Sequence, residues 1–96
     1  MLVDFSIFPV GKGESLSSAV AETFEVIEQS GLPHELHSMG TNIEGEWDEV
    51  MTVIKACRER LFEHANRVSI SIKIDDRKAA KDRLAHKVTS ARAKML

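Results

Sequence analysis

Tyrosine is absent from this chain of 96 residues, tryptophan and cysteine each occur once, and proline occurs twice. The single cysteine, Cys57, excludes a disulfide within the chain, so we expect a reducing, cytoplasmic compartment. No apolar run approaches the roughly 20 residues that cross a bilayer, so we expect no membrane association. The N-terminal stretch lacks a basic region and carries Asp4 among apolar residues, so we expect no signal peptide.

The composition is that of a folded protein with nearly balanced charge. The chain is 43% hydrophobic and has a formal net charge of -2. Domains most often contain roughly 100–150 residues, so we expect residues 1–96 to form a single domain. Enough Leu, Ile, Val and Phe are present to build a core, which argues against intrinsic disorder.

The charges are distributed unevenly along the chain. Residues 1–76 hold 6 basic and 14 acidic side chains, whereas residues 77–96 hold 7 basic side chains and only Asp82 as an acid. A basic end can bind nucleic acid, but proteins that bind single strands use aromatic side chains for stacking, and only Phe62 follows Met51. We therefore expect no nucleic-acid partner, and a helix that docks on an acidic neighbour or faces water is favoured.

The first half of the chain has the pattern of one strand, one helix and a hairpin. Residues 2–10 alternate between apolar and other side chains, which predicts a half-buried strand. Ser15 is the expected N-cap of a helix that ends near Gly31. Its expected apolar face consists of Leu16, Ala19, Val20, Phe24 and Ile27. Residues 34–39 and 41–44 are expected to form two short strands that turn at Gly40.

The second half begins with a helix and continues with the clearest strand. A helix is expected from residues 45–46 onward, with an apolar stripe at helical spacing. The stripe consists of Trp47, Val50, Met51, Ile54, Cys57 and Leu61. Residues 67–75 alternate strictly, so isoleucines face one way and Ser69, Ser71 and Lys73 the other. A terminal helix is expected from residue 78, with Leu84, Val88, Ala91 and Met95 on one face.

The element order β-α-β-β-α-β predicts the fold class. It indicates an α+β ferredoxin-like sandwich, two helices on one face of a four-stranded antiparallel sheet, with an additional C-terminal helix. In that arrangement the first strand lies between the third and the fourth. The face without helices then carries Asp4, Ser6 and Phe8 beside Ser69, Ser71 and Lys73.

The residues that could carry metal or catalytic chemistry are poorly placed for it. His34 and His37 lie three apart on an expected strand, so they point to opposite faces and cannot share an ion. Cys57 lies in an apolar stripe, where a buried structural thiol is favoured over a nucleophile. The glycine-rich turn 11–13 lacks the arginine of an acylphosphatase loop. No nucleophile elbow, P-loop or dinucleotide fingerprint is present, so we expect no enzyme.

Three stretches carry a resemblance to a known family. They are residues 4–11 (DFSIFPVG), residues 39–50 (MGTNIEGEWDEV) and residues 72–77 (IKIDDR), the last followed by Lys87 and Val88. In this order and at these distances the chain resembles the small thiamine-binding proteins, relatives of the YkoF-type binders of thiamine and hydroxymethylpyrimidine. The resemblance implies a ferredoxin-like fold, homo-oligomers up to a homotetramer and binding of thiamine or its pyrimidine half. It implies no catalysis and no required cofactor.

Thiamine is a cation with an aminopyrimidine ring, so it needs a carboxylate, small polar groups and an apolar plate. The candidate ligand-binding residues are Asp4, Ser6, Phe8, Asn42, Glu44, Trp47, Ser69, Ser71 and Lys73. Three competing interpretations remain for this set. Asp4 could instead be an interface ion-pair partner of Lys73, Glu44 could face solvent, and Trp47 could belong to the core or an interface.

Two function classes therefore remain for the chain. The first is non-catalytic binding of a thiamine-type ligand at a sheet face or subunit interface of a homo-oligomer. The second is a structural or regulatory interaction protein of the same fold without a functional ligand site. A third, weaker alternative is a nucleic-acid partner that uses the basic tail.

Overall fold

The computed structural model describes residues 1–11, 16–78 and 84 of the chain. The elements are β1 (Leu2–Pro9), α1 (Leu16–Ser30), β2 (His34–His37), β3 (Gly40–Glu44), α2 (Trp47–Phe62) and β4 (Val68–Asp75). This is the expected order, and the boundaries agree with the expected ones to within two residues. The expected N-cap Ser15 and, apart from Leu84, the expected helix after residue 78 lie outside the described residues.

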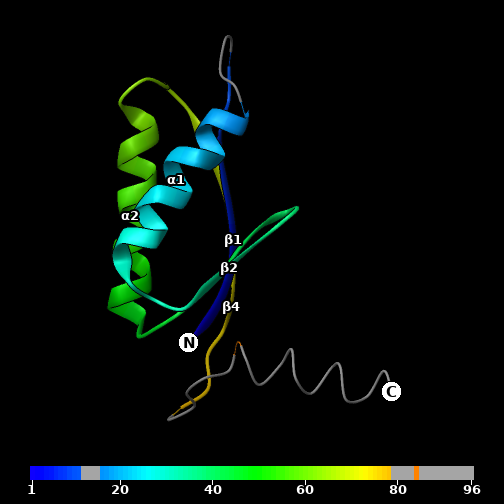
Figure 1. Ribbon diagram of the computed structural model, residues 1–96, viewed down its shortest axis with the longest axis vertical. Coiled ribbons are helices and arrows are strands. Elements are labelled where there is room, and N and C mark those ends of the chain that lie inside the picture. The colour runs from blue at the N-terminus through cyan, green and yellow to red at the C-terminus, as the bar shows by residue number, and fades with distance from the viewer. Residues whose placement is uncertain (12–15, 79–83, 85–96) are drawn as a thin grey trace.

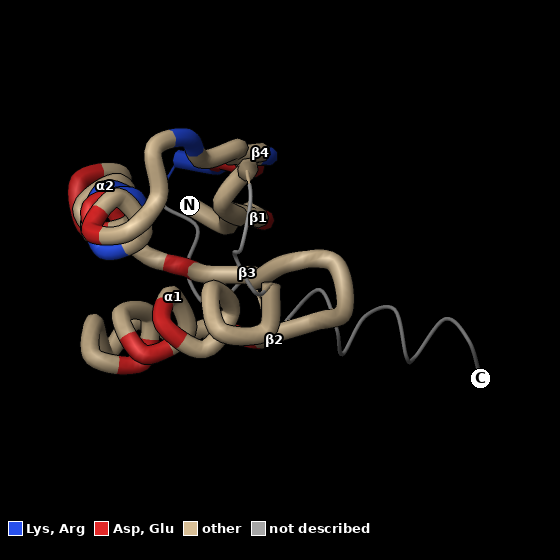
Figure 2. Tube along the Cα trace, turned by 90° about the horizontal axis from the view of Figure 1, so that it is seen from above, with Lys and Arg blue, Asp and Glu red and all other residues tan. Residues whose placement is uncertain are grey.

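The four strands form one antiparallel sheet in the order β2-β3-β1-β4 (Figure 1). The first strand therefore lies between the third and the fourth, as the element order predicts. Both helices lie on the same side of this sheet and contact β1, and α1 also contacts β2 whereas α2 also contacts β4 (Figure 2). The chain has the α+β ferredoxin-like fold.

The two neighbours of β1 pair with it over different lengths. β4 pairs with β1 along all of Leu2–Pro9, whereas β3 pairs with it only along Leu2–Phe5. The β2–β3 hairpin therefore separates from β1 beyond Phe5. Gly40 begins β3 at this point, and a Cβ atom there would lie 2.6 Å from the backbone oxygen of Phe5. The close approach of the two strands requires glycine.

The core lies between the sheet and the two helices. Alternation along β1 buries Val3, Phe5 and Ile7, and the same face of β3 buries Ile43. β4 is less well covered, because Ile72 and Ile74 on this face remain 41% and 37% exposed. The helix-covered face is thus fully packed on the central strands and only partly packed on the β4 edge.

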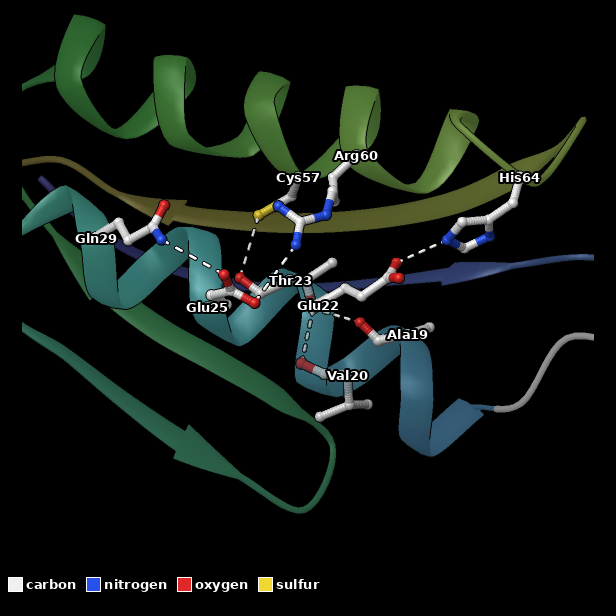
Figure 3. Close-up of polar contacts among 9 residues, drawn as sticks. All are labelled: Ala19, Val20, Glu22, Thr23, Glu25, Gln29, Cys57, Arg60 and His64. Carbon is white, nitrogen blue, oxygen red and sulfur yellow. Dashed lines mark hydrogen bonds and ion pairs between the residues drawn. The ribbon is translucent and has the colours of Figure 1, made fainter.

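Helix α1 buries only part of its expected apolar face. Ala19 and Ile27 are buried as expected, whereas Leu16 and Val20 are exposed and Thr23 is buried as well. Thr23 tolerates burial because its hydroxyl donates to the carbonyl of Ala19 at 3.0 Å (Figure 3). The spacing of apolar residues favours Leu16 and Val20 for the buried face. It does not favour Thr23, because a threonine is a polar residue and the sequence does not show that its hydroxyl has a partner in the helix.

Polar contacts join the two helices along their exposed edges (Figure 3). Arg60 of α2 contacts the carboxylate of Glu25 at 3.4 Å, and His64 just beyond α2 contacts Glu22 at 2.8 Å. The buried thiol of Cys57 on α2 also points at the carbonyl oxygen of Thr23 on α1, 3.7 Å away. The buried cysteine and the surface pairs together hold α1 against α2.

Helix α2 begins with a capping box and buries most of its expected stripe. The backbone N–H of Glu46 donates to Glu49 at 2.9 Å, and the carboxylate of Glu46 accepts in return. The buried residues are Val50, Val53, Ile54, Cys57 and Leu61. Trp47, expected in this stripe, is 53% exposed. As the first helical residue it lies at the end of the core rather than over it, so the expectation that Trp47 belongs to the core is wrong.

Candidate functional site

The sheet face without helices carries the polar residues of β1 and β4. Directly paired residues of antiparallel strands point to the same side of a sheet, so the register decides which side chains meet. Asp4 is paired with Lys73, and Ser6 with Ser71. On its other side Asp4 is paired with Asn42 of β3. We call this surface the open face.

A hollow of about 140 Å³ lies on the open face. Its lining residues are Asp4, Phe5, Ser6, Met39, Ser71, Ile72 and Lys73. One carboxylate, two hydroxyls and one ammonium group therefore meet around it, and Met39 adds an apolar wall from the β2–β3 turn. Asp4, Ser6 and Ser71, which sequence alternation places on one polar floor, do line the same hollow.

The carboxylate of Asp4 is bound by a histidine of the edge strand β2, which β3 separates from β1. Nε2 of His37 lies 2.7 Å from Oδ1 of Asp4. Both side chains are partly exposed. His37 ends β2, and its ring reaches β1 across the position of Gly40, which is paired with His37 and has no side chain. Within one copy of the chain Asp4 thus contacts His37, and the alternative ion pair with Lys73 at an interface stays a prediction.

A larger hollow of about 470 Å³ opens where the hairpin separates from β1. It lies between the hairpin and the first half of α1 and is lined mainly by apolar side chains, among them Phe8, Leu16, Val20, Leu36 and Met39. Among its described lining residues there is no carboxylate and no Lys or Arg. It therefore offers apolar contact area but no counter-charge for a cation.

The other candidate residues are spread around these two hollows. Asn42 lies beside Asp4 on the open face, and Phe8 is paired with Ser69 farther along β1. Phe8 lines the larger hollow, and Ser69 lines neither. Asp4, Ser6, Ser71 and Lys73 thus form one group with Asn42 at its edge.

Glu44 and Trp47 are not part of that group. Glu44 is paired with Leu2 but is only 8% exposed, so the alternative that it faces solvent is wrong. Trp47 lies at the start of α2, outside both hollows. The only aromatic side chain from the candidate set that lines a hollow is Phe8.

Two residues of this region were absent from the candidate set. His37 is considered in the sequence only as a metal ligand, and Met39 only as the end of an expected strand and the start of the stretch 39–50. Alternation places His37 on the face opposite to His34, and the ring of His34 does lie elsewhere, edge-on to Phe24 at 5.5 Å. This alternation is the signal in the sequence that could have placed His37 on the open face. Met39 has no comparable signal, because the path of the turn decides its position.

The described residues contain no group of three or more His, Cys, Asp or Glu placed to hold a metal ion. Nor does any helix among them have the length and apolarity to cross a membrane. Burial raises the pKa of the Cys57 thiol to about 11, so the reactive thiolate is scarce at neutral pH.

The residues of the open-face hollow can accept hydrogen bonds from an amine, donate to ring nitrogens and balance a positive charge.

Comparison with known proteins agrees with this chemistry. Residues 3–92 match the family described as Thiamine-binding protein. A relative from Mycobacterium bovis, the UPF0045 protein Mb1933, is 39% identical over all of this chain and 95% of its own length. These matches cover the strands, helices and open face described above.

Solved structures share the fold. The hypothetical protein MJ1052 of Methanocaldococcus jannaschii superimposes with a TM-score of 0.84 at 33% identity, covering 94% of this chain and 93% of its own. TM0486 of Thermotoga maritima, a candidate thiamine biosynthesis or salvage protein, has a TM-score of 0.82 at 23% identity. Its match covers 94% of this chain and 96% of that one. At that identity the likeness concerns the fold.

Proposed function

Because this chain belongs to the thiamine-binding protein family, we propose that it binds thiamine, or its hydroxymethylpyrimidine half, on the open face. The binding is non-catalytic and requires no cofactor, and the protein acts as a cytoplasmic homo-oligomer. The observation that carries this proposal is the hollow in which Asp4, Ser6 and Ser71 meet.

Asp4 is the central group of the proposed site. One oxygen of its carboxylate is bound by His37, so the other can accept a hydrogen bond from the exocyclic amine of the pyrimidine. The negative charge of Asp4 also balances the positive charge of thiamine. The hydroxyls of Ser6 and Ser71 donate to ring nitrogens, and Asn42 extends this polar floor toward β3.

The size of the hollow supports a site shared between copies of the chain. Complete small-molecule sites usually measure roughly 300–1,000 Å³ and bury most of the ligand. A hollow of about 140 Å³ holds one ring and leaves the rest of thiamine uncovered. A second copy facing the open face would cover the remainder, which is the reason we propose a homo-oligomer.

The test is isothermal titration of thiamine into Asp4→Asn. Loss of a charged hydrogen-bond partner in a partly desolvated site costs on the order of 1.5–3 kcal/mol, so affinity should fall at least about tenfold. Glu35→Gln is the matched control, because Glu35 is also on an open-face strand position and loses the same charge, yet does not line the hollow. Its affinity should stay within about twofold of the unmodified protein.

Light scattering coupled to size exclusion accompanies the titration. The unmodified protein and both variants should have the same mass, a multiple of the 10.7 kDa of one chain. If Asp4→Asn and the unmodified protein bind thiamine with equal affinity, the site does not lie on the open face. An unmodified protein that binds no thiamine would favour the second function, an interaction protein without a ligand site.

A further inference from the structure

His37 is held from two sides, and the two contacts define its protonation. The backbone N–H of Met39 donates to Nδ1 of His37 at 3.2 Å. A nitrogen that accepts a hydrogen bond carries no proton, so the ring is the neutral tautomer with its hydrogen on Nε2. That hydrogen points at Oδ1 of Asp4, 2.7 Å away.

This arrangement decides which way the Asp4 carboxylate turns. Asp4 lies between two potential partners, His37 on the hairpin side and Lys73, with which it is paired, on the β4 side. A contact with Lys73 would neutralise the carboxylate. A contact with a neutral imidazole leaves its full negative charge in the hollow.

We infer that His37 is a positioning residue for ligand binding, an inference that rests on the function proposed above. As a neutral donor it fixes Asp4 on the hairpin side, away from Lys73, and leaves the second carboxylate oxygen to a cationic ligand. The Met39 backbone sets the tautomer that makes this possible. His37 acts through Asp4 and needs no contact with the ligand itself.

Three variants separate positioning from a structural role. His37→Leu removes the donor, whereas His37→Gln keeps an N–H near the position of Nε2. His64→Leu is the matched control, because it removes a histidine from a similar surface pair, 2.8 Å from Glu22 and away from the open face. Thiamine affinity is measured by isothermal titration at pH 8, with the oligomer mass as a check of folding.

At pH 8 we expect His37→Leu to bind about five- to tenfold more weakly, because one hydrogen bond to a charged group is lost. His37→Gln and His64→Leu should bind within about threefold of the unmodified protein.

Nitrogen NMR of the histidine rings in the ligand-free protein tests the tautomer independently. The expected result is an unprotonated Nδ1 and a protonated Nε2 on His37 at pH 8. The opposite tautomer overturns the inference, and so does unchanged affinity in His37→Leu while the unmodified protein binds thiamine. If the unmodified protein binds no thiamine, the proposed function fails and this inference fails with it.

Discussion

The two faces of the sheet are built from alternate residues of the same strands, yet their surroundings are opposite. On β1, Val3 and Phe5 are 0% and 3% exposed beneath the helices, whereas the side chain of Asp4 between them is 51% exposed. On β3, Ile43 is fully buried and its neighbour Asn42 is half-buried. Burial of apolar area stabilises the first face, and the second face is left to polar contacts.

The difference separates stability from binding along one strand. A substitution on the helix-covered face leaves a cavity, because the packed surroundings relax only partly. A substitution on the open face changes hydrogen bonds and charge in a region already in contact with water. Variants of Asp4 can therefore report on binding, whereas variants of its neighbours Val3 and Phe5 report on folding.

Ile43→Ala should have the largest effect on stability. Ile43 is fully buried on β3, and truncation of such a side chain costs about 2–5 kcal/mol. Ile72→Ala is the matched control on the same face, where 41% exposure should limit the cost to roughly 1 kcal/mol. Urea unfolding followed by circular dichroism measures both. Equal losses would mean that the β4 edge is covered as well as the centre of the sheet.

Gly40→Ala should have the next largest effect. A methyl group there meets the backbone oxygen of Phe5 at 2.6 Å, so β3 must move away from β1, at a cost of roughly 1–3 kcal/mol. Gly45→Ala is the control. Its methyl group meets only side-chain atoms of Leu32 and Val50, at 3.3 Å, which can give way.

The same denaturant titration measures both glycine variants. Equal costs would contradict the close approach of β3 to β1. The movement of β3 in Gly40→Ala should also loosen the contact of His37 with Asp4, which links the hairpin to the open face.

The smallest effect concerns the buried thiol. Burial raises the pKa of Cys57 from 9.0 to about 11, so between these values the unfolded chain loses this proton while the folded chain keeps it. The free energy of unfolding should therefore fall as pH rises from 9 to 11, by at most about 1.4 kcal/mol per pH unit. In Cys57→Ala this contribution to the slope should vanish, and equal slopes would show that the thiol is accessible. A thiol reagent should label native Cys57 slowly and the denatured chain quickly.

Much of the fold could be predicted from the sequence because its signals are local. Alternation over residues 67–75 and the start and stop signals around Gly31 and Glu46 indicate each element without knowledge of its neighbours. The element order then leaves few topologies, and the observed one places β1 in the centre, as expected. Alternation also assigns Asp4, Ser6 and Ser71 to one face.

Only the tertiary structure decided which of these side chains meet. His37 and Asp4 are 33 residues apart and lie on strands separated by β3, so their contact depends on register and on the missing side chain of Gly40. The exposure of Trp47 depends on where α2 begins relative to the core. The sequence by itself determined the elements and the polar and apolar faces, because periodicity acts between near neighbours. The site depends on distances between strands, and those are determined when the whole sheet and its helices pack together.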